Sequence, residues 1–457
     1  MATLLGQLFR EQVSKSKDYK MKVETEANVA YPTGYLSFDF LNGSIIHVKA
    51  EGLEYKYYSV GIVDGSMNMF IGRSGCGKTS FTTQIAANIV DKFPTACLFH
   101  DDIEGGLTEA RKAILTKWDE EKLKTKYISR NTGITAENFY QRIRTIANIK
   151  LENRDAYLYD TECLDSNGEK IYKLEPTVYI LDSLALLTPE KYSEEEELSG
   201  QMSTTATAKA NAQIFRRIIP LLKSANIILF IINHINDKVE INPFKKSKLQ
   251  VAWLKEGETL PGGRTPIYLA NNIIRFDDSK MSAKDGLGID GSLVDITLVK
   301  SRTNKAGKSI TLLFNQETGF DPDLSLYIML KQHKKINGAG AYLYIGDRSD
   351  IKFRQSEVKE KLLTNKEFAQ IFSEACMDCL KELIKDVQEE QLFANSNLEI
   401  TNYSSQIDVT NHYDIELKAG KTAQSIGKSS NAGTKDSTEQ ETSLIHNVMQ
   451  SIGGTDT

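Results

Sequence analysis

The sequence has few cysteines and no long apolar run. Only five of its 457 residues are cysteines, and a sparse, odd-numbered set of thiols does not form a disulfide framework. The first residues, MATLLGQLFREQ, lack the basic region and apolar run of a secretory signal. No apolar window approaches the length needed to span a membrane. We therefore expect a cytoplasmic protein with no membrane partner.

Zinc-binding cysteine pairs are also missing. The single Cys-x-x-Cys, CMDC at residues 376–379, has no second pair and no histidine at zinc-ligand spacing. We interpret Cys376 and Cys379 as two positions on an amphipathic helix.

A general excess of positive charge is absent as well. The formal net charge is −5 and the pI is about 5.9, so the surface is not broadly attractive to polyanions. Contact with nucleic acid would therefore need a local basic strip. The net charge alone neither establishes nor excludes DNA binding.

Continuous apolar runs alternate with helical patterns between residues 31 and 321. Strands of this kind joined by helices predict an α/β fold, with a largely parallel central sheet covered by helices on both faces. The hydrophobic content of 40% is enough for this core and a second small domain. Predicted strands occupy residues 67–71, 96–101, 177–184, 227–235, 273–278 and 293–301, and predicted helices occupy 79–93 and 209–225.

Four other segments depart from this pattern. Residues 1–30 form a predicted N-terminal arm that either packs on a neighbour or frays, and its apolar residues share one helical face. Residues 156–176 read as an inserted hairpin around DSNG. Residues 322–418 suggest a small C-terminal α+β domain, and the Ser/Thr/Gly/Lys-rich residues 419–457 should be disordered. The apolar residues of the arm are Leu4, Leu5, Leu8 and Phe9.

The stretch GRSGCGKT, residues 72–79, fits the phosphate-binding pattern G-x-x-x-x-G-K-[ST] between a predicted strand and a predicted helix. In this context we expect ATP and Mg²⁺, with Lys78 bridging the β- and γ-phosphates and Thr79 binding the ion. A glycine-rich turn with an incidental lysine is the alternative. The expected nucleotide-binding residues of this loop are Gly72, Arg73, Ser74, Gly75, Cys76, Gly77, Lys78, Thr79 and Ser80.

Acidic residues end two neighbouring predicted strands. Asp182 closes VYILDS, where we expect it to reach Thr79 and the water shell of Mg²⁺; a simple turn is the alternative. Asp101, Asp102 and Glu104 follow the strand in CLFHDDIEGG. One of these three should position the attacking water, and the other two would cap a helix or lie in solvent.

The ordered motifs PTGYLSFDFLNG, GRSGCGKTSF, ACLFHDDIEGG, VYILDSLALLTPE, IILFIINHI, LPGGRTPIYLANNIIRF and LVKSRTNKAGKS resemble the RecA family of homologous-recombination ATPases. They are most similar to the UvsX type found in tailed phages. The resemblance covers roughly residues 31–321 and extends weakly to about residue 390. It implies a RecA-like P-loop ATPase core, and a host cytoplasm or nucleoid if a phage encodes the protein.

The resemblance also implies roles for individual residues. His234, which closes the strand in IINHI, would sense the γ-phosphate; a histidine that merely ends a strand is the alternative. Lys300 and Arg302 in VKSR would reach the ATP of a neighbouring subunit, unless they only mark a solvated strand edge. The family places its catalytic carboxylate in D-x-E, whereas this chain has DDIE. We choose Glu104 for this role, with Asp102 as the competitor.

Two segments are expected to bind DNA. The long stretch after His234 mixes cations, aromatic residues and paired glycines, which suit phosphates and stacked bases, and it agrees with the second DNA-binding loop of the family. A solvated charged loop is the alternative. The first loop should follow Asp182, with its EEEE run facing away from DNA; a methionine that packs a helix and a lysine that faces solvent are the alternative for its two candidate residues. The expected DNA-binding residues are Met202 and Lys209 in the first segment, and Phe244, Lys245, Lys246, Lys248, Trp253, Gly262, Gly263 and Arg264 in the second.

The leading hypothesis is an ATP-dependent recombinase that forms filaments on single-stranded DNA and exchanges strands with duplex DNA. The partners would be both forms of DNA, further copies of the chain, and single-strand-binding and mediator proteins. A ring helicase of the DnaB type shares the core, but the sequence shows no separate N-terminal helical domain. A regulatory DNA-binding ATPase that does not exchange strands is the third hypothesis, since DDIE could accompany weak hydrolysis.

Overall fold

The computed structural model describes residues 29–50, 53–164, 170–190, 200–237, 254–282 and 289–384. The chain divides into two compact units, Met1–Ala419 and Gly420–Thr457, and all described residues belong to the first. The apolar residues of the predicted N-terminal arm and the predicted tail at 419–457 lie outside the described residues.

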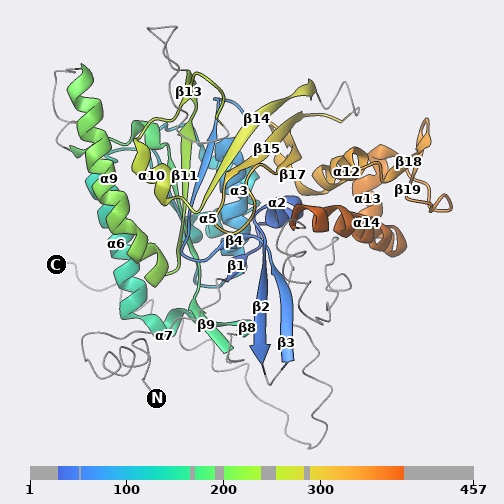
Figure 1. The fold of residues 1–457 in the computed structure, drawn as a ribbon, viewed down its shortest axis with the longest axis horizontal. Coiled ribbons are helices and arrows are strands. Elements are labelled where there is room, and N and C mark those ends of the chain that lie inside the picture. The colour runs from blue at the N-terminus through green and yellow to red at the C-terminus, as the bar shows by residue number, and fades with distance from the viewer. Residues whose placement is uncertain are drawn as a thin grey trace, which may run out of the picture. The chain divides into compact units, whose positions relative to one another are not determined.

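The first unit is built on a nine-stranded sheet in the order β17-β16-β15-β14-β5-β11-β10-β6-β7 (Figure 1). The six strands from β14 to β7 are mutually parallel, as the continuous apolar runs predict. The other three strands, β15, β16 and β17, each pair antiparallel with the preceding strand of the sheet. The predicted strand at 293–301 therefore extends the sheet as a hairpin partner of β14. The strands are β5 (Met67–Gly72), β6 (Leu98–Asp102), β7 (Tyr127–Arg130), β10 (Thr177–Asp182), β11 (Ile227–His234), β14 (Asn272–Ser282), β15 (Ser292–Lys300), β16 (Ser309–Asn315) and β17 (Gly319–Asp321).

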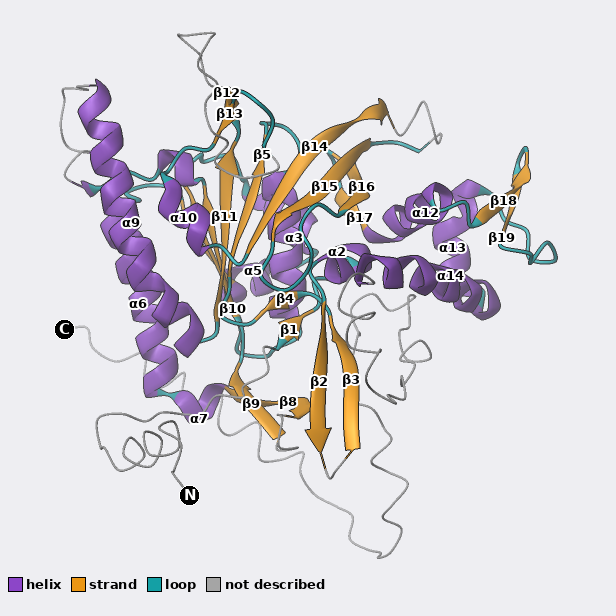
Figure 2. Cartoon of the chain, in the orientation of Figure 1, coloured by secondary structure: helices purple, strands orange, loops and turns teal. Residues whose placement is uncertain are grey.

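Helices cover both faces of this sheet (Figure 2). Because side chains alternate along a strand, Phe70 and Phe230 enter the core on one face while Met69 and Leu229 enter the core on the other. The first face is covered by α2 (Leu36–Leu41), α3 (Lys78–Asp91) and α5 (Glu120–Lys126). The second face is covered by α6 (Ala136–Glu152), α9 (Gly200–Ser224) and α10 (Arg264–Leu269).

Helix α9 differs from its prediction because it begins at Gly200 and not near residue 209. The added residues are GQMSTTATA at 200–208, and after the first, Gly200, none is a glycine or proline that would stop a helix. Part of the predicted first DNA-binding loop is therefore helical.

Several antiparallel strand pairs of the described residues lie apart from the large sheet. β8 (Leu158–Leu164) pairs antiparallel with β9 (Lys170–Leu174), which confirms the hairpin predicted within 156–176, although its turn lies outside the described residues. β2 (Ser44–Ala50) pairs with β3 (Leu53–Ser59), and the sequence patterns did not predict this hairpin. Short pairs also join β1 (Ala30–Tyr31) to β4 (Ile62–Val63) and β12 (Asn236–Asp237) to β13 (Glu258–Thr259).

The elements after Asp321 form their own hydrophobic cluster, which also takes in Leu36 and Phe40 of α2. Cys376 and Cys379 are free thiols on α14 whose pKa values are raised by burial, which confirms their interpretation as helix positions. The elements are α12 (Pro322–Gln332), β18 (Ile336–Ala339), β19 (Tyr342–Ile345), α13 (Val358–Thr364) and α14 (Lys366–Ile384). No helix in the described ranges is both long and apolar enough to cross a membrane.

Candidate functional site

A pocket of about 370 Å³ opens at the carboxyl ends of the parallel strands β5, β11 and β10. This edge of a parallel α/β sheet is where ligands usually bind. The pocket brings together residues from the glycine-rich loop, from β10 and β11, from the segment that follows β6, and from β16 with the turn after it. Its lining residues are Ser74, Gly75, Gly77, Lys78, Thr79, Ser80, Glu104, Asp182, Ile232, His234, Phe314 and Gln316.

The glycine-rich loop joins β5 to α3, as the motif predicts. Gly77 is the N-cap of α3 with φ of 81°, in the left-handed region that favours glycine. A Cβ at this position would lie 2.8 Å from the ring of Phe320. The helix therefore begins without a side-chain cap, and its first N–H groups have no acceptor within the helix. An anion at this helix terminus would satisfy them.

Lys78 is folded back across this loop. Its Nζ donates hydrogen bonds to the carbonyl oxygens of Gly72 at 3.1 Å and Arg73 at 2.7 Å, and the residue is only 5% exposed. These bonds hold the ammonium group beside the pocket, where it can compensate the charge of an anion.

Thr79 and Asp182 meet as the sequence predicts. Thr79 Oγ1 donates to Asp182 Oδ2 at 2.6 Å. Burial raises the pKa of Asp182 to about 7, although the Thr79 hydroxyl acts in the opposite direction. A divalent cation beside this carboxylate and hydroxyl would stabilise the ionised form, and both oxygens are ligands that Mg²⁺ accepts.

The three acids of DDIE have three different environments. Asp101 is fully buried and accepts hydrogen bonds from Arg130, Arg142 and Tyr179. Asp102 accepts the backbone N–H groups of residues 105 and 107 at 2.9 and 3.1 Å. Both side chains therefore stabilise the surrounding fold through these hydrogen bonds. Glu104 is the acid of this stretch that lines the pocket.

Glu104 also contacts His234, a pairing that the sequence did not indicate. His234 Nε2 lies 2.5 Å from Glu104 Oε1. Glu104 follows β6 and His234 ends β11, on opposite sides of β10. The candidate water-positioning acid and the candidate sensor are therefore one hydrogen-bonded pair.

Several residues of the site lie beyond the reach of the motifs. Phe314 and Gln316 enter the pocket from β16 and the turn after it, far along the chain. Arg111 Nη2 lies 3.2 Å from Ser80 Oγ. No local pattern marks these residues, and only the pairing of distant strands would have found them.

Three expected residues of the loop do not line the pocket: Gly72, Arg73 and Cys76. The Arg73 side chain turns to Asp237, with Nη2–Oδ1 at 2.7 Å and Nη1–Oδ2 at 3.0 Å. The Cys76 thiol donates to the carbonyl of Arg73 at 2.9 Å. These two side chains shape the loop, and the Arg73 pair ties it to the segment after His234.

Lys300 and Arg302 lie at the carboxyl end of α10 within the same chain. Lys300 Nζ donates to the carbonyl oxygens of Ile267, Tyr268 and Ala270 at 2.8 to 2.9 Å, where a cation is favoured by the helix dipole. Arg302 is exposed, and its guanidinium Nη2 donates to Tyr268 O at 3.1 Å. Neither residue lines the pocket of its own chain.

The two predicted DNA-binding segments meet in part. A Cβ on Gly263 would lie 3.2 Å from the Cβ of Ala208, next to Lys209 on α9. Lys209 and Arg264 are exposed, and Gly262 and Gly263 both have φ near 90°. Met202 lies in α9. The remaining predicted residues, Phe244, Lys245, Lys246, Lys248 and Trp253, lie outside the described residues.

Comparison with known proteins gives a similarity to a named phage protein and a negative result for family models. No family model matches the chain. The chain is similar to the "Recombination and repair protein" of Enterobacteria phage T4, with 23% identity over 264 residues. The match covers 57% of this chain and 56% of the phage protein, so it spans little more than half of either. Its name agrees with the recombination class suggested by the ordered motifs.

Proposed function

We propose that this protein is an ATP-dependent DNA recombinase with a RecA-like P-loop core, acting in recombination, repair and recombination-dependent replication. It would form filaments on single-stranded DNA and promote homologous pairing and strand exchange. The observation that carries the proposal is the convergence of the glycine-rich loop, the Thr79–Asp182 pair and the Glu104–His234 pair on one pocket. Similarity to the phage protein named for recombination and repair supports the choice of pathway.

ATP would bind with its phosphates at the amino end of α3. Lys78 would exchange its two carbonyl bonds for the β- and γ-phosphates, and Thr79 would bind Mg²⁺ with Asp182 behind it. Glu104 would orient the attacking water. His234, already bonded to Glu104, would transmit the presence of the γ-phosphate to the segment that follows β11.

The DNA strand would lie along Lys209, Gly262, Gly263 and Arg264, together with the cations and aromatic residues of 244–253. Exposed cations neutralise phosphates, and glycines permit close approach of a backbone. Arg302 and Lys300 would complete the ATP site of a neighbouring protomer, so assembly and hydrolysis would depend on one another. The N-terminal arm is our candidate for docking onto that neighbour.

Electron microscopy with ATP and single-stranded DNA, combined with an ATPase assay, tests the proposal. We expect extended filaments, DNA-stimulated hydrolysis and strand exchange. Lys78→Ala should abolish hydrolysis, whereas Lys124→Ala, at an exposed lysine on α5, should not. Closed hexamers that unwind duplex DNA would instead identify a ring helicase. Nucleotide binding without filaments or hexamers would identify a regulatory ATPase, and absence of nucleotide binding would refute all three.

A further inference from the structure

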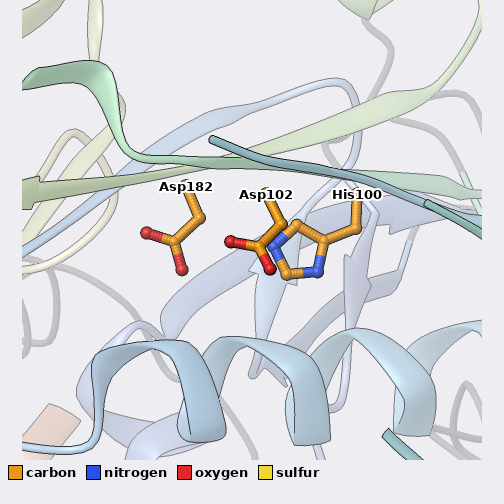
Figure 3. A group of neighbouring side chains, drawn as sticks. All are labelled: His100, Asp102 and Asp182. Carbon is orange, nitrogen blue, oxygen red and sulfur yellow. The ribbon is translucent and has the colours of Figure 1, made fainter. Parts of the chain in front are cut away.

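His100, Asp102 and Asp182 form a buried cluster (Figure 3), and Asp182 also lines the pocket. His100 and Asp102 project from the same face of β6, and Asp182 projects from β10, where it is directly opposite Asp102. The three residues are 0%, 5% and 2% exposed. One ligand atom from each lies within 4.8 Å of the others, so a single small ion is within reach of all three.

Two polar atoms of the cluster are buried with no hydrogen-bond partner among the described residues. They are His100 Nε2 and Asp182 Oδ1. A buried polar atom left without a hydrogen-bond partner destabilises the fold, so two at one place indicate a shared ligand. The Nε2 edge of the imidazole faces the two carboxylates in Figure 3.

Each side chain of the cluster is held in place by a second contact. His100 Nδ1 lies 2.7 Å from the Tyr127 hydroxyl, which leaves Nε2 as the free edge of the ring. The Asp102 oxygens accept two backbone N–H groups, and Asp182 Oδ2 accepts the Thr79 hydroxyl. Outer contacts of this kind orient the ligands of metal sites.

Charge also favours a cation at this position. Asp102 and Asp182 are adjacent buried carboxylates, and two like charges at low dielectric repel one another. A divalent cation with two carboxylates and one neutral imidazole makes a site of zero net charge. Burial of that assembly costs far less than burial of two adjacent carboxylates with no cation between them.

We propose that His100, Asp102 and Asp182 bind a second divalent cation, separate from the ion proposed at Thr79. The two ions would share Asp182, one at each carboxylate oxygen. An imidazole nitrogen among the ligands favours a first-row transition ion such as Mn²⁺ over Mg²⁺, which prefers oxygen ligands and retained waters. This proposal needs no bound nucleotide and stands independently of the recombinase function.

Electron paramagnetic resonance of Mn²⁺ added to the full chain without nucleotide tests this site. We expect one bound ion that retains its signal under excess Mg²⁺ and shows coupling to an imidazole nitrogen, with the splitting changed by ¹⁵N-histidine labelling. His100→Gln should remove the nitrogen coupling and weaken Mn²⁺ binding at least about tenfold. His333→Gln, at a half-exposed histidine outside the cluster, is the matched control and should bind as the parent does.

The same spectra contain the result that would overturn the proposal. Bound Mn²⁺ without nitrogen coupling in the unsubstituted chain, or no bound ion, would leave a buried water as the ligand of His100 Nε2. Both of these outcomes are measured on the unsubstituted chain, so they do not depend on whether His100→Gln folds. ATP hydrolysis is not the readout, so failure here is distinct from failure of the proposed function.

Discussion

At the scale of single residues, neighbouring acids in one stretch of sequence have different tasks. Asp101 is neutralised by two arginines, Asp102 holds the following turn, and Glu104 faces the pocket beside His234. The sequence left Glu104 and Asp102 as competitors for the water-positioning role. The contacts favour Glu104, because the Asp102 oxygens already accept two backbone N–H groups.

Substitution of these two acids should separate catalysis from stability. Glu104→Gln should lower kcat for ATP hydrolysis by about 10²- to 10⁴-fold with little change in the melting temperature. Asp102→Asn should lower the free energy of unfolding by about 1–3 kcal/mol, because an amide cannot accept both backbone bonds as a carboxylate does. Steady-state kinetics and urea unfolding of both variants measure these effects. A larger loss of kcat in a stable Asp102→Asn would reverse the assignment.

Lys150 is a buried cation away from the pocket. Its Nζ donates to Glu175 O, Thr177 Oγ1 and Asn226 O at 2.6, 3.1 and 3.3 Å, which ties α6 to the amino ends of β10 and β11. Burial lowers the pKa of Lys150 from its usual 10.5 to about 7, against the opposing charge of Glu175. Between these pH values the unfolded chain binds one more proton than the folded chain at this residue, so the stability contributed here rises with pH.

We therefore expect the unfolding free energy of the parent to rise relative to Lys150→Met between about pH 7 and pH 10.5, by at most about 1.4 kcal/mol per pH unit. Urea unfolding across this range measures the difference. Lys209→Met, at an exposed lysine of α9, serves as the control. A constant difference between the parent and Lys150→Met would show that burial does not shift this lysine.

At the scale of elements, the junction between β5 and α3 shapes the pocket. Gly75 and Gly77 have φ of 85° and 81°, but their surroundings differ. A Cβ on Gly75 would meet nothing within 4 Å, whereas one on Gly77 would meet the rings of Phe320 and Phe314. The loop is therefore fixed both by its own conformation and by strands at the far edge of the sheet.

Alanine at these two glycines should have unequal effects. Gly75→Ala should cost about 1–2 kcal/mol for the left-handed conformation alone. Gly77→Ala should cost roughly 1–3 kcal/mol more, because the Phe320 ring must also move. Denaturant unfolding without nucleotide compares them directly. Equal losses would mean that the contact between the loop and β17 does not constrain α3.

The sequence predicted the elements with long apolar runs and missed those defined by pairing. β5, β10 and β11 and helix α3 lie where continuous apolar residues and the glycine motif place them. The β2–β3 hairpin and the antiparallel pairing of β15 with β14 depend on which strands pair in the folded chain. A local sequence pattern does not specify that pairing. The early start of α9 falls on residues that have only weak helix preferences of their own, so the local pattern did not mark it.

At the scale of the whole molecule, the proposed ATP site would use residues from two protomers. The Lys300 side chain makes three bonds to the end of α10, so its removal would disturb its own chain, whereas the exposed Arg302 side chain donates to Tyr268 O alone among the described residues. Substitution of Arg302 should therefore disturb its own chain less, and it is the better test of whether this strand contributes a cation to the ATP site of a neighbouring protomer.

A mixture of Lys78→Ala and Arg302→Ala should recover activity that neither variant has alone. In a head-to-tail assembly of equal amounts, about a quarter of the interfaces would pair an intact loop with an intact arginine. DNA-stimulated ATPase activity of the mixture should thus reach about a quarter of the parent value. Activity equal to the mean of the separate variants would exclude a shared site that uses Arg302.

The sequence by itself determined the chemistry available at the pocket and the framework that carries it. A glycine-rich loop between a strand and a helix, and acids after buried strands, follow from local residue preferences and from the periodicity of apolar side chains. Only the tertiary structure decided which acid faces the pocket, that His234 contacts Glu104, and that His100 is buried beside two carboxylates. These relations join residues on separate strands, and their distances depend on strand order and register, which the chain acquires only when the whole sheet has assembled.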